Sequence, residues 1–177
     1  TRHSMTPCMS AEASREAGSP HRWGTVVEMT HLVRLRDGTG GPGDNSLRVI
    51  PEEDGRSGIV TIPAGRTFLS VAQELNQQKP SWVFRVNTEL GPLTIGAAAC
   101  GATKDSSFPR EPGQVCHDVA GMRLVRPDGI PMDLREGNPD LEALRCSYGL
   151  FGIVTEVTCR VYPREYISLS HAKIRPR

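Results

Sequence analysis

Apolar and polar residues alternate after Gly152 in the manner of a β-strand that Pro163 ends. One face of this strand is expected to carry Ile153, Thr155, Val157, Cys159 and Val161. The other face is expected to carry Glu156, Thr158 and Arg160. Shorter apolar runs predict further strands at residues 25–29, 32–36, 47–50, 59–62, 81–87, 119–125 and 130–134. These patterns predict short strands joined by turns.

Two pairs of these strands carry hairpin signals. A charged turn at residues 51–58 separates the runs 47–50 and 59–62, and a Pro-Asp-Gly turn at residues 127–129 separates the last two. By contrast, residues 1–24 show no lasting period and are predicted to form a loop with one short helix around 11–17. The glycine-rich residues 37–44 are predicted to form an exposed loop.

Two segments have the marks of helices. From Thr67, the expected N-cap, apolar residues recur at the spacing of one helical face until Lys79 and Pro80 stop the pattern. That face carries Phe68, Val71, Ala72 and Leu75. Asn138 and Pro139 predict the start of a second helix, because asparagine caps helices well and proline suits the first helical position. This helix is expected to run to about Cys146.

The charge balance narrows the classes of function. The chain has 177 residues, of which 21 are Lys or Arg and 20 are Asp or Glu, so its net charge is +1. This balance gives no electrostatic reason to expect a nucleic acid or an anionic membrane as a partner. The weakly polar segment 91–102 is too short to span a bilayer. The length suits one domain with its own core.

The cysteines favour neither a zinc site nor a dense disulfide framework, because they are odd in number and form no C-x-x-C pair. They are Cys8, Cys100, Cys116, Cys146 and Cys159. No metal site is predicted from them. A reducing, cytoplasmic compartment is expected.

Residues 91–112 are dominated by Gly, Ala, Ser, Thr and Pro, so their backbone can come close to a neighbour. A diphosphate is bound by several backbone N–H groups that point into one concavity, and residues 96–102 are candidates for such a site. Nearby groups that could add contacts are the hydroxyls of Thr94, Thr103, Ser106 and Ser107 and the charge of Lys104. The alternative is a tightly packed turn where a strand crosses a helix, and both interpretations stay open.

His117 and Asp118 stand side by side and could suggest an acid–base pair. Adjacent residues on an extended segment point to opposite sides, however. A structural turn is therefore the favoured interpretation.

Four segments carry a resemblance. Residues 2–4, Arg-His-Ser, resemble the end of an Arg-x-Gly-Gly-His-Ser loop, and residues 60–65, Val-Thr-Ile-Pro-Ala-Gly, resemble a valine-rich strand before a helix. Residues 93–96 and 100–103, Leu-Thr-Ile-Gly and Cys-Gly-Ala-Thr, resemble a Thr-Val-Gly-Gly plus Gly-Thr-His region. Residues 148–156, Tyr-Gly-Leu-Phe-Gly-Ile-Val-Thr-Glu, match a Gly-x-x-Gly-Ile-Val-Thr-Glu closing strand. In this order they resemble the FAD-binding domain of the vanillyl-alcohol oxidase / p-cresol methylhydroxylase (PCMH-type) flavoproteins.

The resemblance implies an α+β fold with mixed sheets flanked by helices. Residues 1–163 would form the PCMH-type FAD-binding domain, and residues 164–177 a tail or a connection to another domain. The implied function is that of a flavin-dependent oxidase or dehydrogenase, in which hydride passes from a small organic substrate to flavin N5. The residues assigned to FAD are Arg2, His3, Ser4, Thr94, Gly96, Ala97, Cys100, Gly101, Ala102, Thr103, Gly152, Ile153 and Val154.

The sequence departs from the family's pattern in places. Thr1 and Arg2 stand where the family has glycines, and Ala97 replaces its second glycine. His3 matches a histidine that several members bond covalently to the flavin 8α-methyl group; a covalent bond, a noncovalent contact and no role at all stay open. Cys100 lacks the motif of the cysteine that some members bond to flavin, so a small buried residue is expected. The departures motivate an alternative function, a degenerate module that contacts another protein.

The resemblance also implies parts that this sequence does not contain. Family members usually have a strand-helix-strand lead-in before the His-Ser loop and a larger cap domain that forms the substrate pocket. The favoured explanation is that a second chain or a further part of the polypeptide supplies them, and such a partner would pair with an open sheet edge. The alternative is a shortened relative of the family that does without them. The catalytic base and the substrate are unassigned, because the resemblance places both with the cap.

Overall fold

The computed structural model describes residues 46–86, 88, 91–105, 107, 112–166, 168, 170 and 171. The predictions for the first 45 residues lie outside this part of the chain. They concern the loop with its short helix, the strands 25–29 and 32–36, the exposed loop 37–44, Cys8 and the segment Arg2, His3 and Ser4. Ser106 also lies outside it.

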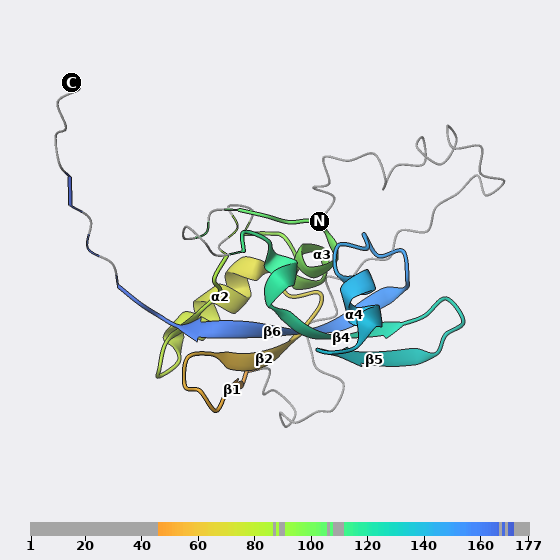
Figure 1. Cartoon of the computed structure of the whole chain (residues 1–177), viewed down its shortest axis with the longest axis horizontal. Coiled ribbons are helices and arrows are strands. Elements are labelled where there is room, and N and C mark those ends of the chain that lie inside the picture. Colours follow the sequence, from red (N-terminus) through yellow and green to blue (C-terminus); the bar gives the residue numbers. More distant parts are fainter. Residues whose placement is uncertain are drawn as a thin grey trace, which may run out of the picture.

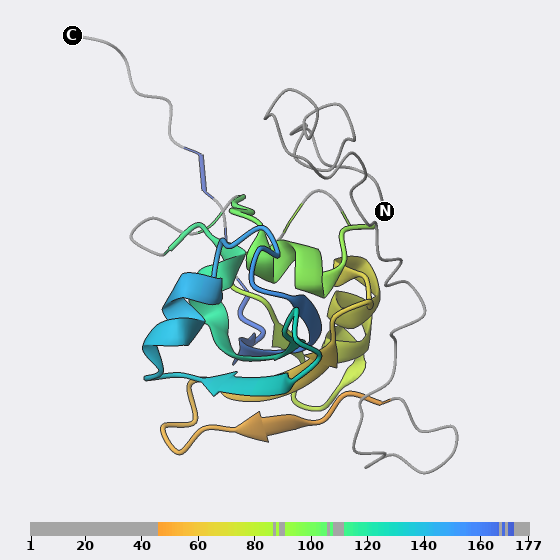
Figure 2. The same ribbon diagram turned by 90° about the vertical axis from the view of Figure 1, so that its right-hand side faces the viewer.

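The described residues form an antiparallel sheet with helices on one side. In chain order the elements are β1 (Val49–Pro51), β2 (Gly58–Pro63), α2 (Phe68–Gln77), β3 (Trp82–Val83), α3 (Ile95–Cys100), the 3₁₀-helix η2 (Val115–Asp118), β4 (Val119–Val125), β5 (Pro131–Arg135), α4 (Pro139–Leu144) and β6 (Ile153–Pro163). The strand order is β1-β2-β6-β4-β5, with β3 paired to the end of β6. Figures 1 and 2 show α2, α3 and α4 on the same side of this sheet.

The α+β class is confirmed. The resemblance implied mixed sheets, whereas every strand pairing among the described residues is antiparallel. Both expected hairpins are present, because β1 pairs with β2 and β4 pairs with β5. In the second hairpin the Arg126 N–H donates to the Ile130 carbonyl, and Gly129 takes a φ of 81° that favours glycine. The strand expected at 81–87 is much shorter, since only Trp82 and Val83 pair.

Strand β6 is central, but its face pattern is only partly as expected. Val157, Cys159 and Val161 are buried, as the alternation predicts. At its start the pattern is reversed, because Ile153 is exposed and Val154 is buried. The physical reason is a β-bulge: Arg123 pairs with Glu156 and Leu124 pairs with Val154, so Thr155 is an extra residue. The expectation that Ile153 shares a face with Val157 is therefore wrong.

Helix α2 forms as expected. The Thr67 hydroxyl oxygen accepts a hydrogen bond from the Ser70 N–H at 3.2 Å, which satisfies one free donor of the first turn. Phe68, Val71 and Leu75 are buried against the sheet. Burial of a side chain such as Leu75 stabilises the fold by about 1.5–3 kcal/mol. The predicted face of this helix is therefore its core face.

Helix α4 is also present, and it ends earlier than expected. The Asn138 side chain accepts from the Asp140 N–H at 2.9 Å, and Leu141 and Leu144 are buried. The helix stops at Leu144, and Cys146 has a left-handed φ of 56°. Such a conformation cannot continue a right-handed helix, so the chain turns here toward β6.

Candidate functional site

Two of the segments assigned to the cofactor meet at the end of helix α3. The Tyr148 N–H donates a hydrogen bond of 2.9 Å to the Cys100 carbonyl oxygen, and the Cys100 thiol also hydrogen-bonds the Ser147 side chain. Helix α3 itself contacts β6. The fold thereby places residues 100–103 beside the turn that leads to Gly152. These segments are about 50 residues apart in sequence, which fits one shared site.

The first turn of helix α3 lies against the loop that follows strand β2. The Thr94 hydroxyl oxygen caps it by accepting from the Ala97 N–H at 3.4 Å. The Ile95 N–H donates to the Arg66 carbonyl at 2.8 Å, and the Gly96 N–H donates to the Ala64 carbonyl at 2.9 Å. The first turn of α3 is thus fixed to residues 64–66.

Gly96 is required by this contact. A Cβ atom at Gly96 would lie 2.9 Å from the Ala64 Cβ, closer than real Cβ atoms come. The tightly packed crossing of a helix and a strand end, one of the two interpretations of this segment, is therefore confirmed for Gly96. It does not exclude a ligand on the other side of the backbone.

The backbone amides of this segment are largely engaged within the protein. The N–H groups of Gly96, Ala98 and Gly101 donate to the carbonyls of Ala64, Thr94 and Ala97. The expectation that amides from 96 to 102 gather in one concavity is therefore wrong for these three. The Ala97 N–H is engaged as well, with the Thr94 hydroxyl. Ala97 and Ala102 are nevertheless exposed and carry only a methyl group, so a ligand can approach the chain there.

The residues after α3 connect it to the rest of the sheet. The Thr103 N–H donates to the Gly101 carbonyl at 2.6 Å, and the Thr103 carbonyl accepts from the Val115 N–H at 3.0 Å. Lys104 is exposed and forms an isolated bridge with Gln114. Segment 101–104 is thereby attached to η2.

Cys100 has the role expected of it. Its side chain is buried, with 7% of its surface exposed, and its sulfur is a free thiol. Burial raises the pKa of this thiol to about 11, partly offset by the hydrogen bond with Ser147. Such a thiol stays protonated near neutral pH and acts as a small apolar residue.

Gly152 lies where the chain enters strand β6. A Cβ atom there would be 2.4 Å from the Val125 carbonyl oxygen, and its φ of 149° is one that other residues rarely adopt. Of the residues that follow, Ile153 is 41% exposed and Val154 is buried at 8%. Gly152 and Ile153 can therefore face a ligand, whereas the side chain of Val154 belongs to the core.

The turn before Gly152 exposes large apolar side chains. They are Tyr148, Leu150 and Phe151, with 58%, 82% and 52% of their surface exposed. Beside them lies a cavity of about 380 Å³. Its lining includes Leu124, Met132, Leu144, Leu150 and Phe151. None of the residues assigned to FAD that the structure describes lines this cavity.

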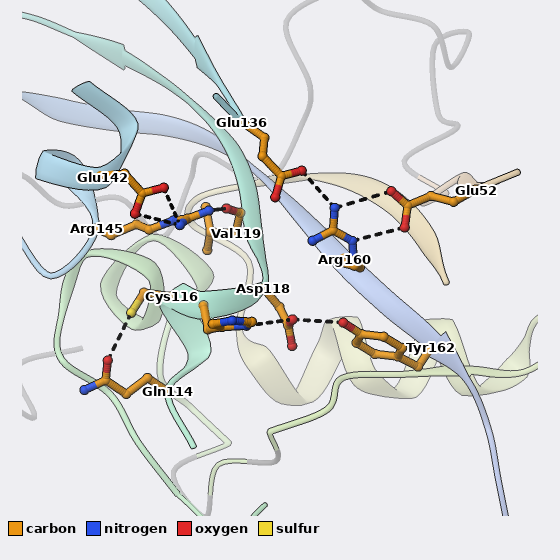
Figure 3. Close-up of polar contacts among 11 residues, drawn as sticks. Glu52, Gln114, Cys116, Asp118, Val119, Glu136, Glu142, Arg145, Arg160 and Tyr162 are labelled. Carbon is orange, nitrogen blue, oxygen red and sulfur yellow. Dashed lines mark hydrogen bonds and ion pairs between the residues drawn. The ribbon is translucent and has the colours of Figure 1, made fainter. Parts of the chain in front are cut away.

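A second cavity, of about 520 Å³, is polar, and sequence reasoning missed it. Its lining includes Glu52, Arg56, Arg85, Arg160 and Tyr162. Arg160 donates to Glu52 at 3.0 Å and to Glu136 at 2.8 Å (Figure 3). Arg160 holds the pKa of Glu52 below its usual value, with the hydroxyl of Ser57 contributing. The lining side chains come from β6, from the β1–β2 turn and from the segment after β3, and Glu136 follows β5. Because these segments are far apart in sequence, no local pattern predicts the cavity.

The partly buried Tyr162 and the buried Asp118 form a pair beside this cavity. The Tyr162 hydroxyl donates to the Asp118 carboxylate at 2.9 Å (Figure 3), and the Arg85 guanidinium lies 3.9 Å from the centre of the tyrosine ring. Burial raises the pKa of Tyr162 above its usual value, and the negative charge of Asp118 adds to this. The pair attaches η2 to the end of strand β6.

His117 and Asp118 are not on an extended segment as expected, because both belong to η2. The His117 Nδ1 lies 3.3 Å from the Asp118 Oδ1. The reasoning from extended geometry is therefore wrong. Since Asp118 is also bonded to Tyr162, its contacts attach a turn to the sheet, in keeping with the structural interpretation.

Comparison with known proteins gives matches at the level of structure. No protein-family model matches the chain, and no curated protein sequence matches it. Among solved structures, alkyldihydroxyacetonephosphate synthase matches with a TM-score of 0.51 at 18% identity, over 67% of this chain and 22% of that one. A histidine-to-alanine variant of cholesterol oxidase from Brevibacterium sterolicum matches with a TM-score of 0.53 at 23% identity, over 76% and 24%.

Xylooligosaccharide oxidase from Myceliophthora thermophila C1, in complex with xylobiose, matches with a TM-score of 0.53 at 21% identity, over 68% of this chain and 25% of that one. The matched region is about a quarter of each of these proteins. None of the helices in the described part of this chain is long and apolar enough to span a membrane. The chain thus has the fold of the PCMH-type FAD-binding domain of FAD-linked oxidases.

Proposed function

We propose that this chain is the FAD-binding portion of a flavin-dependent oxidoreductase that transfers hydride from a small organic substrate to flavin. The observation that carries the proposal is the shared fold with FAD-linked oxidases, together with the order of four motifs along the chain. When bound, FAD supplies the hydride acceptor. The residues of this chain bind and orient it.

The described residues fit such a cofactor in one respect. Ala97 and Ala102 expose only a methyl group on helix α3 and the turn after it, so a large planar or phosphorylated ligand can come close to the backbone. Gly96 and Gly152 fix this backbone by close contacts with Ala64 and Val125. The proposed contribution of Cys100 and Val154 is packing, because their side chains are buried.

The amides do not by themselves hold a diphosphate, because those of Gly96, Ala98 and Gly101 already have protein acceptors. We therefore assign the diphosphate contacts chiefly to the segment Arg2, His3 and Ser4 and to the hydroxyls of Thr94 and Thr103. A further part of the polypeptide or a second chain would complete the site and supply the substrate pocket. The strands β1 and β5, at the two ends of the described strand order, are the edges to which it could add.

The test is flavin binding by the complete polypeptide. Purified protein is expected to be yellow, with an absorbance band at about 450 nm, or to gain this band when FAD is added. Acid precipitation would then separate a noncovalent flavin from one bonded to His3, with His3→Ala as the control. Protein that stays colourless after FAD is added would contradict the proposal.

A second function is a non-catalytic module for protein contact. The exposed apolar side chains of Tyr148, Leu150 and Phe151 favour it, since large apolar groups clustered on a surface mark binding sites. Intact-mass measurement of the purified assembly distinguishes the two functions. A complex with a partner but without flavin would support the module, and a complex that retains flavin would support the oxidoreductase.

A further inference from the structure

Two thiols from distant parts of the chain lie in contact under the end of helix α4. The sulfur of Cys116, in η2, is 3.3 Å from the sulfur of Cys146, in the turn after α4. The residues are 30 positions apart, and both are free thiols. A disulfide bond is about 2 Å long, so the two sulfurs would have to approach by only about 1.3 Å.

The two thiols differ in how far they are buried. Cys116 is buried, with 5% of its surface exposed, and its thiol donates toward the Gln114 side-chain oxygen at 3.6 Å (Figure 3). Cys146 is only partly buried. A small oxidant from solution therefore reaches Cys146 first.

The backbone surroundings of the two cysteines also differ. It has a left-handed φ of 56°, in a turn whose residues Tyr148, Gly149, Leu150 and Phe151 are exposed. Cys116, in contrast, is held in η2, whose residue Val115 donates to the Thr103 carbonyl at 3.0 Å. The partly buried Cys146 thus lies next to an exposed turn, whereas Cys116 lies in a buried segment.

We propose that Cys116 and Cys146 form a reversible redox site that a hydroperoxide converts to a disulfide. The Cys146 thiolate attacks one oxygen of the peroxide, the O–O bond breaks, and the other oxygen leaves as an alcohol or water after taking up a proton. The Cys116 sulfur then attacks the sulfenic sulfur of Cys146 and expels water. In total, two thiols lose two electrons and two protons, and the peroxide is reduced by the same number of electrons.

The electrostatics agree with this order of events. Burial and the neighbouring Cys146 raise the pKa of the Cys116 thiol to about 11, and the positive charge of Arg145 opposes part of this rise. Cys116 is therefore a poor first nucleophile near neutral pH. Arg145 is held in place by Glu142 at 2.7 Å and by the Val119 carbonyl, so its charge stays beside the pair.

The bond would act on the turn that joins the two candidate cofactor segments. Cys146 is two residues before Tyr148, whose N–H is bonded to Cys100. A disulfide closes a loop of about 30 residues, from η2 through β4, β5 and α4, and so restricts the unfolded chain. The oxidised protein is therefore expected to melt at a higher temperature than the reduced protein.

The test uses the whole protein and needs no bound cofactor, so its outcome is independent of the proposed oxidoreductase. The protein is treated with hydrogen peroxide, its remaining thiols are blocked, and peptides are mapped by mass spectrometry without reductant. The expected product is one cross-linked peptide pair containing Cys116 and Cys146, about 2 Da lighter than the two thiol peptides together, which dithiothreitol splits again. The melting temperature should rise on oxidation and return on reduction.

Two variants and one control separate the roles. In Cys116→Ser, oxidised Cys146 should accumulate as a sulfenic acid that a diketone probe traps. In Cys146→Ser, Cys116 should stay reduced at the same peroxide dose. In Cys159→Ala, which removes a buried thiol of β6, the cross-link should still form. A cross-link between another pair of cysteines, or irreversible oxidation of Cys146 without a cross-link in the unsubstituted protein, would overturn the proposal.

Discussion

Gly152 and the Val125 carbonyl oxygen are so close that a Cβ atom on the glycine would lie 2.4 Å from that oxygen. The φ of 149° at Gly152 is a second, independent constraint. We expect Gly152→Ala to lower the free energy of unfolding by about 2–4 kcal/mol, from backbone strain and overpacking together. Urea unfolding measures this loss.

Gly149 is the matched control for this substitution. It also has a positive φ, of 77°, but a Cβ atom there would meet nothing within 4 Å. Gly149→Ala should therefore cost only about 1–2 kcal/mol, the usual cost of a left-handed residue. Equal losses in the two variants would show that the close approach to Val125 contributes nothing.

Ala97 offers a test of cofactor binding that does not weaken the fold. It is the third residue of α3, and a glutamate there would form a capping box with Thr94. Ala97→Glu should keep or slightly raise stability, yet weaken FAD binding about tenfold or more, because its negative charge would repel a diphosphate. The affinity is measured by titration with FAD.

Ala97→Gln separates charge from size. Glutamine also fits a capping box and is nearly as large as glutamate, but it is neutral. We expect its affinity for FAD to lie between those of the unsubstituted protein and the glutamate variant. If all three proteins bind FAD equally, Ala97 does not face the cofactor.

Tyr162 should make stability sensitive to alkaline pH. Burial and Asp118 raise its folded pKa above the unfolded value of 10.0, so the protonated hydroxyl stabilises the fold. This contribution is complete below pH 10.0 and is lost as the pH rises toward the folded pKa. In Tyr162→Phe, the loss of stability above pH 10 should be smaller than in the unsubstituted protein.

Denaturant unfolding at pH 8 and pH 10.5 checks this prediction. Tyr166→Phe is the control, because that side chain is 83% exposed. At pH 8 the Tyr162→Phe protein should itself be less stable by about 1–3 kcal/mol, since it leaves Asp118 without one hydrogen bond. A pH dependence identical to that of the unsubstituted protein would disprove the assignment.

Glu52 should make the stability of the fold sensitive to acidic pH. Arg160 lowers its folded pKa below the unfolded value of 4.5, so the ionised carboxylate stabilises the fold. This contribution is present above pH 4.5 and disappears as the pH falls through the folded pKa. Because the Glu52 side chain is 31% exposed, we expect it to be worth less than about 1 kcal/mol.

The comparison is between Glu52→Gln and Glu53→Gln, a neighbouring exposed glutamate. Thermal melts at pH 7 and pH 3.5 should show a smaller acid-induced decrease of the melting temperature for Glu52→Gln than for Glu53→Gln. Added salt should reduce the difference at pH 7. Indistinguishable acid profiles would mean that the contact with Arg160 carries no net stability.

The sequence predicts the elements whose signals are local. Thr67 and Asn138 mark two helix starts correctly, because a capping side chain bonds an amide two or three residues later. The Pro-Asp-Gly turn before Ile130 likewise marks a hairpin, since the residues that define it are adjacent. These elements need no information from the rest of the chain.

The predictions from sequence fail where tertiary contacts determine the local structure. Helix α3 is not among the predicted elements, although Thr94 followed by the alanines of residues 97–99 is a usable helix signal, because the glycines at 96 and 101 have low helix propensity. The bulge at Thr155 is set by its pairing with β4 and reverses the face of Ile153. A period of two carries no sign of such an extra residue.

The sequence likewise predicts some features of the candidate site and not others. Motifs in sequence identify the segments around Gly96 and Gly152, but not the bond from Tyr148 to Cys100 that holds them together. The contact between Cys116 and Cys146 was also absent from the sequence prediction, because spacing along the chain does not report distance in space. The carbonyl groups that accept hydrogen bonds from the amides of α3 could not be predicted from the sequence for the same reason.

Among the described strands, β6 is the last to be made by the ribosome, yet it is the one that β2 and β4 share. Strand β2 ends at Pro63, about 100 residues before β6 ends, which corresponds to about 5–20 s of synthesis at usual rates. During that time β2 has only the short strand β1 as a partner among the described strands. The edge of β2 that pairs with β6 therefore stays accessible to chaperones until β6 emerges.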